Sequence, residues 1–268
     1  MINFLKTGLL YADVLTTVSP SYAREILHPE YGMGLQDILN ERRDSLVGIL
    51  NGVDYNDWNP EADPLIPYAY GSRRIAGKKK NKLALMKELG LDCSDDMPLI
   101  GMVTRLTEQK GLDLVEQVIP EMMMQRRFAM AILGSGDPHF EHFFSWLHRR
   151  YPDRVCFYCG FNNPLAHRIE AGADIFVMPS RYEPCGLNQL FSLRYGTIPV
   201  VRKTGGLADS VEPFDEERFV ACVEGGVLDV QKELILESGD EDTRRTYLYT
   251  GKTSRATYSR FHDLWDES

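Results

Sequence analysis

Residues 183–187, with the sequence Glu-Pro-Cys-Gly-Leu, place a carboxylate, a turn and a helix start at one point. Free backbone N–H groups at a helix start favour negative charge, so a phosphorylated ligand could be held there. A second such point, residues 204–209 (Thr-Gly-Gly-Leu-Ala-Asp), also follows an apolar run. Either point alone is more often a tight turn. Together, after consecutive strands, they predict a nucleotide site.

Apolar and amphipathic stretches alternate through the region that carries these turns. The expected strands are residues 99–103, 128–133, 155–158, 175–178 and 198–201, with helices such as 112–124 and 140–150 between them. This alternation predicts an α/β fold, a Rossmann-like doubly wound parallel sheet with helices on both faces. Ligands of such sheets bind beyond the carboxyl ends of the strands. The residues expected there are Arg105, Gly134, Phe161, Glu183 and Gly205.

Composition narrows the functional classes. The chain has 268 residues, of which 43% are apolar, enough to bury a core. Its net charge of −9 argues against a general nucleic-acid surface but allows a local basic pocket. No apolar run reaches the roughly 18 residues of a membrane span, and residues 1–10 are too short and interrupted for a secretory signal. We expect no membrane or nucleic-acid partner.

The cysteines and histidines predict no disulfide framework and no metal site. Five cysteines suit a reducing compartment, so we expect a cytoplasmic protein. Cys156 and Cys159 have the spacing of a metal pair, but they lie in a run that we interpret as a buried strand. The lysines at 78–80 are interpreted as a solvated helix face.

Several motifs, in a fixed order, resemble the bacterial glycogen synthases and plant starch synthases, the family 5 glycosyltransferases. The resemblance extends from residue 2 to about residue 211 and includes Thr-Val-Ser-Pro-Ser-Tyr-Ala at 17–23, Arg105-Leu106, Gln109-Lys110-Gly111 and residues 183–187. The family moves glucose from ADP-glucose to the non-reducing end of an α-1,4-glucan with retention, using two facing Rossmann domains. This resemblance implies a hexosyltransferase of the GT-B class that acts in glycogen biosynthesis.

The resemblance also implies roles for single residues. Arg105 and Lys110 match the cations on the donor diphosphate, where charge builds on the leaving group. Glu183 matches the acid beside the donor sugar, although a capping acid is the plainer alternative. Phe161 stands where the family stacks a ring on the base, or is a core residue. The remaining residues expected to bind nucleotide sugar are Cys185, Gly186, Leu187, Asn188, Thr204, Gly205 and Gly206.

Two departures from the family limit the expected activity. The family's N-terminal domain should precede residue 1, and the resemblance ends near Val211.

Position 191 distinguishes among related transferases. It is Phe191 where many of them have a second glutamate, which suits the synthases and argues against a sucrose or trehalose synthase-like enzyme. We expect a remnant of the N-terminal acceptor domain in residues 1–45, a nucleotide-sugar-binding domain in 46–211 and a divergent tail in 212–268.

We therefore interpret the chain as the donor-binding half of a truncated glycogen synthase, inactive alone. It is expected to bind ADP-glucose and glucan without cofactor or metal. The alternative is a non-catalytic nucleotide-sugar or glucan binding module that acts with a separate N-terminal chain.

Overall fold

A five-stranded parallel sheet forms the larger of two units in the computed structural model, which describes residues 3–94 and 97–212. Its strands, in spatial order, are β5 (Val155–Cys159), β4 (Ala129–Gly134), β3 (Leu99–Val103), β6 (Ile175–Met178) and β7 (Ile198–Val201). The chain runs outward from β3 in one direction and then from β6 in the other. The predicted strands and the doubly wound topology are confirmed, with the switch point between β3 and β6.

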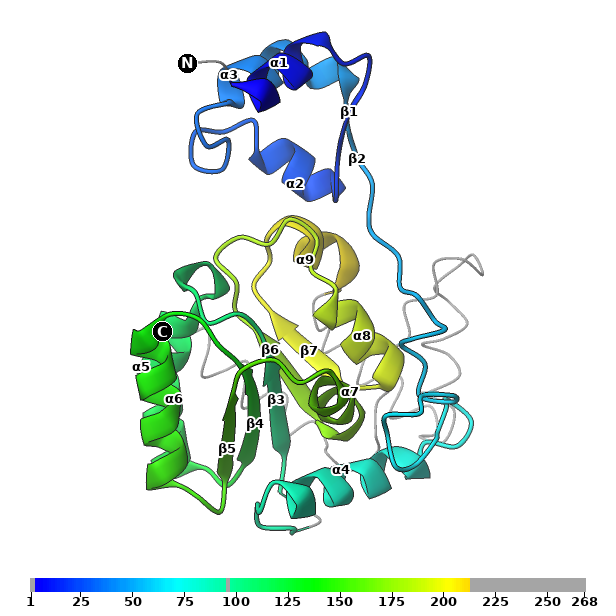
Figure 1. Cartoon of the computed structure of the whole chain (residues 1–268), viewed down its shortest axis with the longest axis vertical. Helices are drawn as coiled ribbons and strands as arrows, with labels where there is room; N and C mark the ends of the chain where they lie inside the picture. Colours follow the sequence, from blue (N-terminus) through cyan, green and yellow to red (C-terminus); the bar gives the residue numbers. More distant parts are fainter. Residues whose placement is uncertain (1–2, 95–96, 213–268) are drawn as a thin grey trace, which may run out of the picture.

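Helices cover both faces of this sheet (Figure 1). Helices α5 (Leu112–Gln125) and α6 (Pro138–Arg150) pack on one face, where Ile100 and Met102 point. Helices α4 (Ala76–Glu88) and α7 (Asn163–Gly172) pack on the other, against Leu99 and Phe176. Because both faces are buried, successive residues of each inner strand are apolar, as the unbroken apolar runs predicted.

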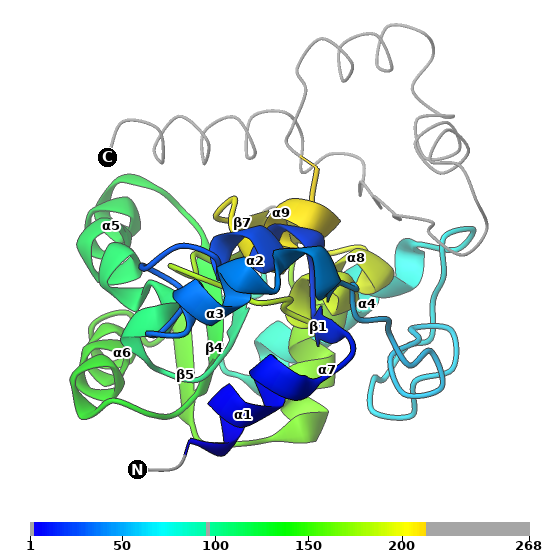
Figure 2. The same ribbon diagram turned by 90° about the horizontal axis from the view of Figure 1, so that it is seen from above.

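A smaller N-terminal unit lies beside α9 (Gly205–Ser210), above the larger unit in Figure 1 and over it in Figure 2. Its elements are α1 (Phe4–Tyr11), β1 (Leu15–Thr17), α2 (Pro20–Glu25), α3 (Gln36–Glu41), η1 (Arg43–Ser45) and β2 (Leu46–Gly48). Strands β1 and β2 pair in parallel. Residues 46–48 therefore pair with the N-terminal unit, one strand beyond the expected boundary after residue 45. Of the expected tail, 212–268, residues 213–268 lie outside the described residues.

One short helix joins the two units. Ser19 caps α2 by accepting the Tyr22 N–H at 3.0 Å, which is the helix start expected at this point. In the same first turn, the N–H and hydroxyl of Ser21 donate to Asp209 of α9 at 2.7 and 2.6 Å. Since α9 follows β7, the N-terminal unit lies at the carboxyl edge of the large sheet.

The connection between the units, residues 49–75, is anchored by an aromatic stack. Trp58 lies between His167 of α7 and Phe191 of α8 (Asn188–Tyr195), with ring centroids 3.8 and 3.9 Å away. Asp63 accepts hydrogen bonds from the Tyr195 hydroxyl at 2.6 Å and from His167 at 2.9 Å. Position 191 is thus a packing residue in this fold.

The lysine run is only partly solvated, which corrects the expectation. Lys79 and Lys80 are exposed, but Lys78 is 3% exposed. Its ammonium donates to the Thr197 hydroxyl at 2.6 Å and to the carbonyls of Glu170 and Ala171 at the end of α7. Unsatisfied carbonyls at a helix end attract a cation, which accounts for the burial.

The cysteine pair also differs from expectation. Strand β5 is the edge of the sheet rather than a fully buried strand, and Cys159 is exposed while Cys156 is half-buried. Within residues 3–94 and 97–212, no group of three or more His, Cys, Asp or Glu side chains could hold a metal ion. In the same part of the chain, no helix has the length and apolar character needed to cross a membrane.

Candidate functional site

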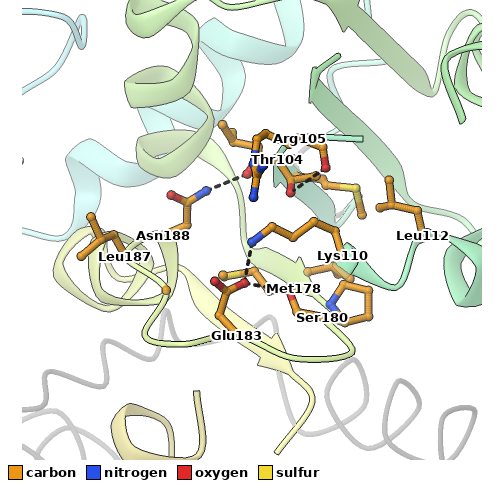
Figure 3. A pocket seen from close by; sticks show the side chains of 14 residues that line it. Thr104, Arg105, Lys110, Leu112, Met178, Ser180, Glu183, Leu187 and Asn188 are labelled. Atoms are coloured by element: carbon orange, nitrogen blue, oxygen red, sulfur yellow. Dashed lines mark hydrogen bonds and ion pairs between the residues drawn. The ribbon is translucent and has the colours of Figure 1, made fainter. Parts of the chain in front are cut away.

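A cavity of ≈ 380 Å³ opens at the switch point, between the carboxyl ends of β3 and β6 (Figure 3). In a doubly wound sheet this crevice is where ligands bind. Its wall combines the ends of these strands with η2 (Glu108–Lys110) and the start of α8. The lining residues with polar side chains are Thr104, Arg105, Lys110, Ser180, Glu183 and Asn188.

Lys110 and Glu183 form an ion pair in this wall. The ammonium lies 2.5 Å from one carboxylate oxygen, and the Ser180 hydroxyl donates to the same oxygen at 3.0 Å. Gly111 brings the two loops together. Its φ is +65°, and a Cβ atom there would lie 2.0 Å from the carbonyl oxygen of Pro179. Glu183 therefore accepts hydrogen bonds and does not cap a helix, the alternative that the sequence left open.

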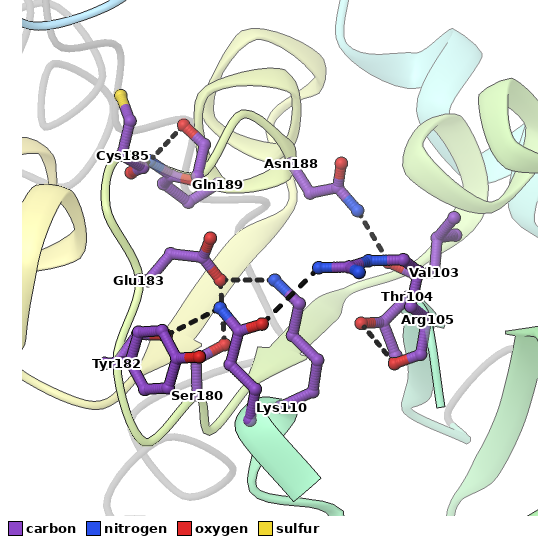
Figure 4. Close-up of polar contacts among 12 residues, drawn as sticks. Val103, Thr104, Arg105, Lys110, Ser180, Tyr182, Glu183, Cys185, Asn188 and Gln189 are labelled. Carbon is purple, nitrogen blue, oxygen red and sulfur yellow. Dashed lines mark hydrogen bonds and ion pairs between the residues drawn. The ribbon is translucent and has the colours of Figure 1, made fainter. Parts of the chain in front are cut away.

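Arg105 supplies the second cation. Its side chain is exposed, and its guanidinium donates to the side-chain oxygen of Gln109 at 3.4 Å (Figure 4). This contact is to a neutral group, whereas Lys110 contacts a carboxylate. The positive charge of Arg105 is therefore not offset by its partner, which makes this side of the cavity suited to an anion.

The start of α8 forms another part of the cavity wall. Gly186, Leu187 and Asn188, which are expected from the sequence to bind nucleotide sugar, all line it. Gly186 has φ +71°, and a Cβ atom there would lie 2.4 Å from the side-chain oxygen of Gln189. The Asn188 amide donates to the Val103 carbonyl at 2.6 Å. This bond ties the helix start to the end of β3, so the α8 N-terminus has a fixed place at the cavity.

Cys185 does not line the cavity, contrary to the expectation. Its side chain is 4% exposed, and burial raises the pKa of its thiol. The Gln189 amide, itself buried, donates to its carbonyl at 2.9 Å. A Cβ atom on Gly206 would lie 2.3 Å from the Cys185 Cα. The contacts of Cys185 are therefore those of a packing residue with a protonated thiol.

The second predicted turn, residues 204–206, supports Glu183 rather than the cavity wall. The Gly206 N–H donates to the Glu183 carbonyl at 3.0 Å. Glu25 of the N-terminal unit accepts from the Gly205 N–H at 2.7 Å and from the Thr204 hydroxyl at 3.1 Å. A carboxylate of the chain itself thus takes the N–H group that the sequence assigned to a ligand phosphate.

Phe161 follows β5 and is 88% exposed, so the core alternative is wrong. It is not among the residues that line the cavity. An aromatic ring exposed to this extent gains nothing from the core and has both faces available for contact. Its place after β5, at the carboxyl edge of the sheet, is the one that the sequence predicted.

Three supporting residues were given no role from the sequence. Ser180 donates to Glu183, Gln109 contacts Arg105, and Gln189 holds the turn at residues 185–186. Gln109 lies between Arg105 and Lys110 in the sequence, and this position could have predicted that its side chain lies near the site. The role of Gln189 could not have been predicted from the sequence, because a polar residue in the first turn of a helix is common.

Two protein families match the chain. The model of the starch synthase catalytic domain matches residues 1–41, and that of glycosyl transferases group 1 matches residues 90–242. The second match, to this broader family, extends past Val211, where the motifs shared with the glycogen and starch synthases end.

Curated relatives and solved structures agree with these matches. The glycogen synthase of Anaeromyxobacter dehalogenans is 55% identical over 214 residues, covering 80% of this chain and 45% of the relative. Glycogen synthase 1 of Geobacter metallireducens is 53% identical over 219 residues, covering 81% and 43%. The chain thus spans less than half the length of either relative.

Among solved structures, the catalytic domain of starch synthase IV from Arabidopsis thaliana, bound to ADP and acarbose, superposes with a TM-score of 0.76. It is 32% identical, and the match covers 99% of this chain and 58% of that one. Sucrose-phosphate synthase from Thermosynechococcus elongatus, at 17% identity and a TM-score of 0.53, shares the fold alone.

Proposed function

This chain belongs to the group 1 glycosyl transferases, and from that premise we propose that it is the donor-binding half of an ADP-glucose-dependent glycogen synthase. The proposed reaction transfers glucose from ADP-glucose to the non-reducing end of an α-1,4-glucan with retention of configuration. The observation that carries the proposal is the meeting of Arg105, Lys110 and Glu183 at one cavity on the switch point of the sheet.

The charges of the cavity suit this reaction. As the bond between glucose and ADP breaks, negative charge builds on the leaving diphosphate, and cations fixed nearby stabilise the transition state. Arg105 and Lys110 would supply that charge from the chain itself, so the proposal requires no metal or cofactor. Glu183 would hydrogen-bond the glucose hydroxyls or support the positive charge of the sugar ring.

Adenine is the base that we propose. Starch synthase IV, at 32% identity, was solved with ADP. Phe161, exposed beyond the end of β5, would stack on the base. Stacking is tolerant of base identity, so the choice between adenine and uracil would depend on neighbouring backbone contacts.

Full transfer would need more than this chain. The chain matches less than half of either relative, and the glucan acceptor would bind between two domains. We propose a cytoplasmic enzyme, since the free cysteines of the described residues suit a reducing compartment.

The second candidate is a module that acts with a separate N-terminal chain. One feature favours it: α1 buries none of its residues, with Phe4 84% and Tyr11 83% exposed, beside a sheet of only two parallel strands. Parallel strands are rarely stable without further strands and covering helices. If this non-catalytic candidate holds, the chain should form a complex with the purified N-terminal half of a relative, and the mixture should transfer no glucose; restored transfer would exclude it.

Calorimetric titration with ADP tests the main proposal. The chain should bind ADP, and the double variant Arg105→Ala, Lys110→Ala should bind at least about 100-fold more weakly, because two charge-assisted contacts are lost. The matched control is Lys87→Ala with Arg149→Ala, an exposed pair on α4 and α6. Equal ADP affinity in the site variant and the control would overturn the proposal.

A further inference from the structure

Gln109 joins the two loops that carry the charged residues of the cavity. We propose that it is a positioning residue, which fixes the Arg105 guanidinium relative to the Glu183 loop and so prepares the site for a diphosphate. The proposal rests on the proposed function, because it assigns Gln109 to the same donor site. It concerns a residue that lies between Arg105 and Lys110 in the chain but does not itself line the cavity.

Three hydrogen bonds meet at this residue. The backbone carbonyl of Gln109 accepts from the Arg181 N–H at 2.8 Å. Its side-chain amide donates to the Tyr182 carbonyl at 3.3 Å, and its side-chain oxygen accepts from Arg105 at 3.4 Å. Figure 4 shows Arg105, Lys110, Tyr182 and Glu183 close to one another.

The chemistry of the amide explains why glutamine suits this position. One primary amide both donates and accepts, so a single side chain can contact a carbonyl on one loop and a guanidinium on the other. A glutamate could accept from Arg105 but could not donate to Tyr182. A leucine of similar size could do neither, while it would still fill the half-buried space.

The two cations of the site depend on Gln109 to different extents. Lys110 is already held by its ion pair with Glu183. Arg105 is exposed, and its long side chain would otherwise sample many rotamers that binding must then restrict. Fixing Arg105 beforehand lowers that cost, so the effect of Gln109 on diphosphate binding should act through Arg105.

A double-mutant cycle measured by ADP calorimetry tests this dependence. Gln109→Leu should weaken ADP binding about tenfold, the scale of one hydrogen bond to a charged group. In an Arg105→Ala background, the same substitution should change the affinity less than about twofold. The matched control is Gln125→Leu, an exposed glutamine of α5, which should leave the affinity unchanged. Equal losses in both backgrounds would overturn the proposal, because a general structural role does not depend on Arg105.

A second readout separates this proposal from the donor-site proposal. The ¹⁵N relaxation of the Arg105 Nε group, recorded without ligand, should show increased motion in Gln109→Leu and restored order in Gln109→Glu, which keeps an acceptor for Arg105. Unchanged Arg105 motion in Gln109→Leu would overturn the positioning role. Absence of ADP binding by the unaltered chain would overturn the proposed function, while the relaxation data would still decide the role of Gln109.

Discussion

The ammonium of Lys110 lies 2.5 Å from a carboxylate oxygen of Glu183, although 73 residues separate the two in the sequence. The pair is only slightly exposed, and it joins the loop after β3 to the loop after β6. A diphosphate entering the cavity would therefore share Lys110 with Glu183. Arg105, whose partner is neutral, would be the cation more readily available to the ligand.

This difference predicts that the two cations contribute differently to stability. Lys110→Ala should lower the free energy of unfolding by about 1–3 kcal/mol, because Glu183 keeps its charge but loses its partner. Arg105→Ala should change it by less than about 0.5 kcal/mol, as expected for an exposed side chain. Urea unfolding of both variants measures this, and equal losses would contradict the pairing seen here.

Phe161 should matter for the nucleotide and not for folding. Because its ring is 88% exposed, Phe161→Ala should leave the free energy of unfolding within about 0.5 kcal/mol of the original. ADP affinity should fall about tenfold, the scale of a lost base stack, and Phe161→Tyr should retain it. Tyr11→Ala, which removes a similarly exposed ring from α1, is the control. An unchanged ADP affinity in Phe161→Ala would exclude base stacking at this position.

Phe191→Glu should destabilise the packing of α8 against Trp58 rather than add a catalytic acid. The Phe191 ring lies 3.9 Å from Trp58 with an interplanar angle of 3°, and the side chain is buried. A glutamate there loses the stack and buries a charge without a partner, at a cost of about 3 kcal/mol or more. Thermal unfolding measures the loss, with Phe191→Leu as the milder comparison. A variant as stable as the original would contradict the packing role of Phe191.

Stability should depend on pH through two buried groups. Burial raises the pKa of Glu170 to about 8 from an ordinary 4.5, and lowers that of Lys78 to about 7 from 10.5. Between pH 4.5 and about 7, the folded state holds a proton on Glu170 that the unfolded state lacks, so this group makes stability fall as pH rises. Above about pH 8, the unfolded state holds a proton on Lys78 that the folded state lacks, so stability rises.

Glu170→Gln isolates the first of these effects. The Ser192 hydroxyl can still donate to a glutamine oxygen, as it does to Glu170 at 2.8 Å. The variant should gain stability relative to the original between pH 5 and 7, by up to about 1.4 kcal/mol per pH unit. Urea unfolding at several pH values measures the difference, with the exposed Glu121→Gln as control. A constant difference across this range would contradict a protonated Glu170.

The sheet was predictable because its strands carry their own signal. Residues 99–103 and 175–178 are unbroken apolar runs, which a strand buried on both faces requires, and both became strands with those bounds. Their carboxyl ends meet at the switch point by topology alone. Arg105 and Glu183 could therefore be assigned to one site from the expected order of the strands.

The contacts that hold the site in place were not predictable in the same way. Glu25 occupies the turn at residues 204–205 from a distance of about 180 residues, and nothing in its local sequence points to that partner. Lys78 resembled a surface lysine because its burial depends on the end of α7, which is distant in the sequence. The local sequence pattern indicates which face of a helix is apolar, but it does not indicate which distant polar group a given polar side chain will contact.

The most direct test of the donor site is a thermal melt of the whole chain with ADP-glucose, with UDP-glucose as comparator. A ligand that binds only the folded state raises the melting temperature by mass action. The account predicts a rise with ADP-glucose that exceeds the rise with UDP-glucose and that disappears in the Arg105→Ala, Lys110→Ala variant. A cooperative melt unmoved by ADP-glucose at millimolar concentration would contradict a donor site formed by this chain.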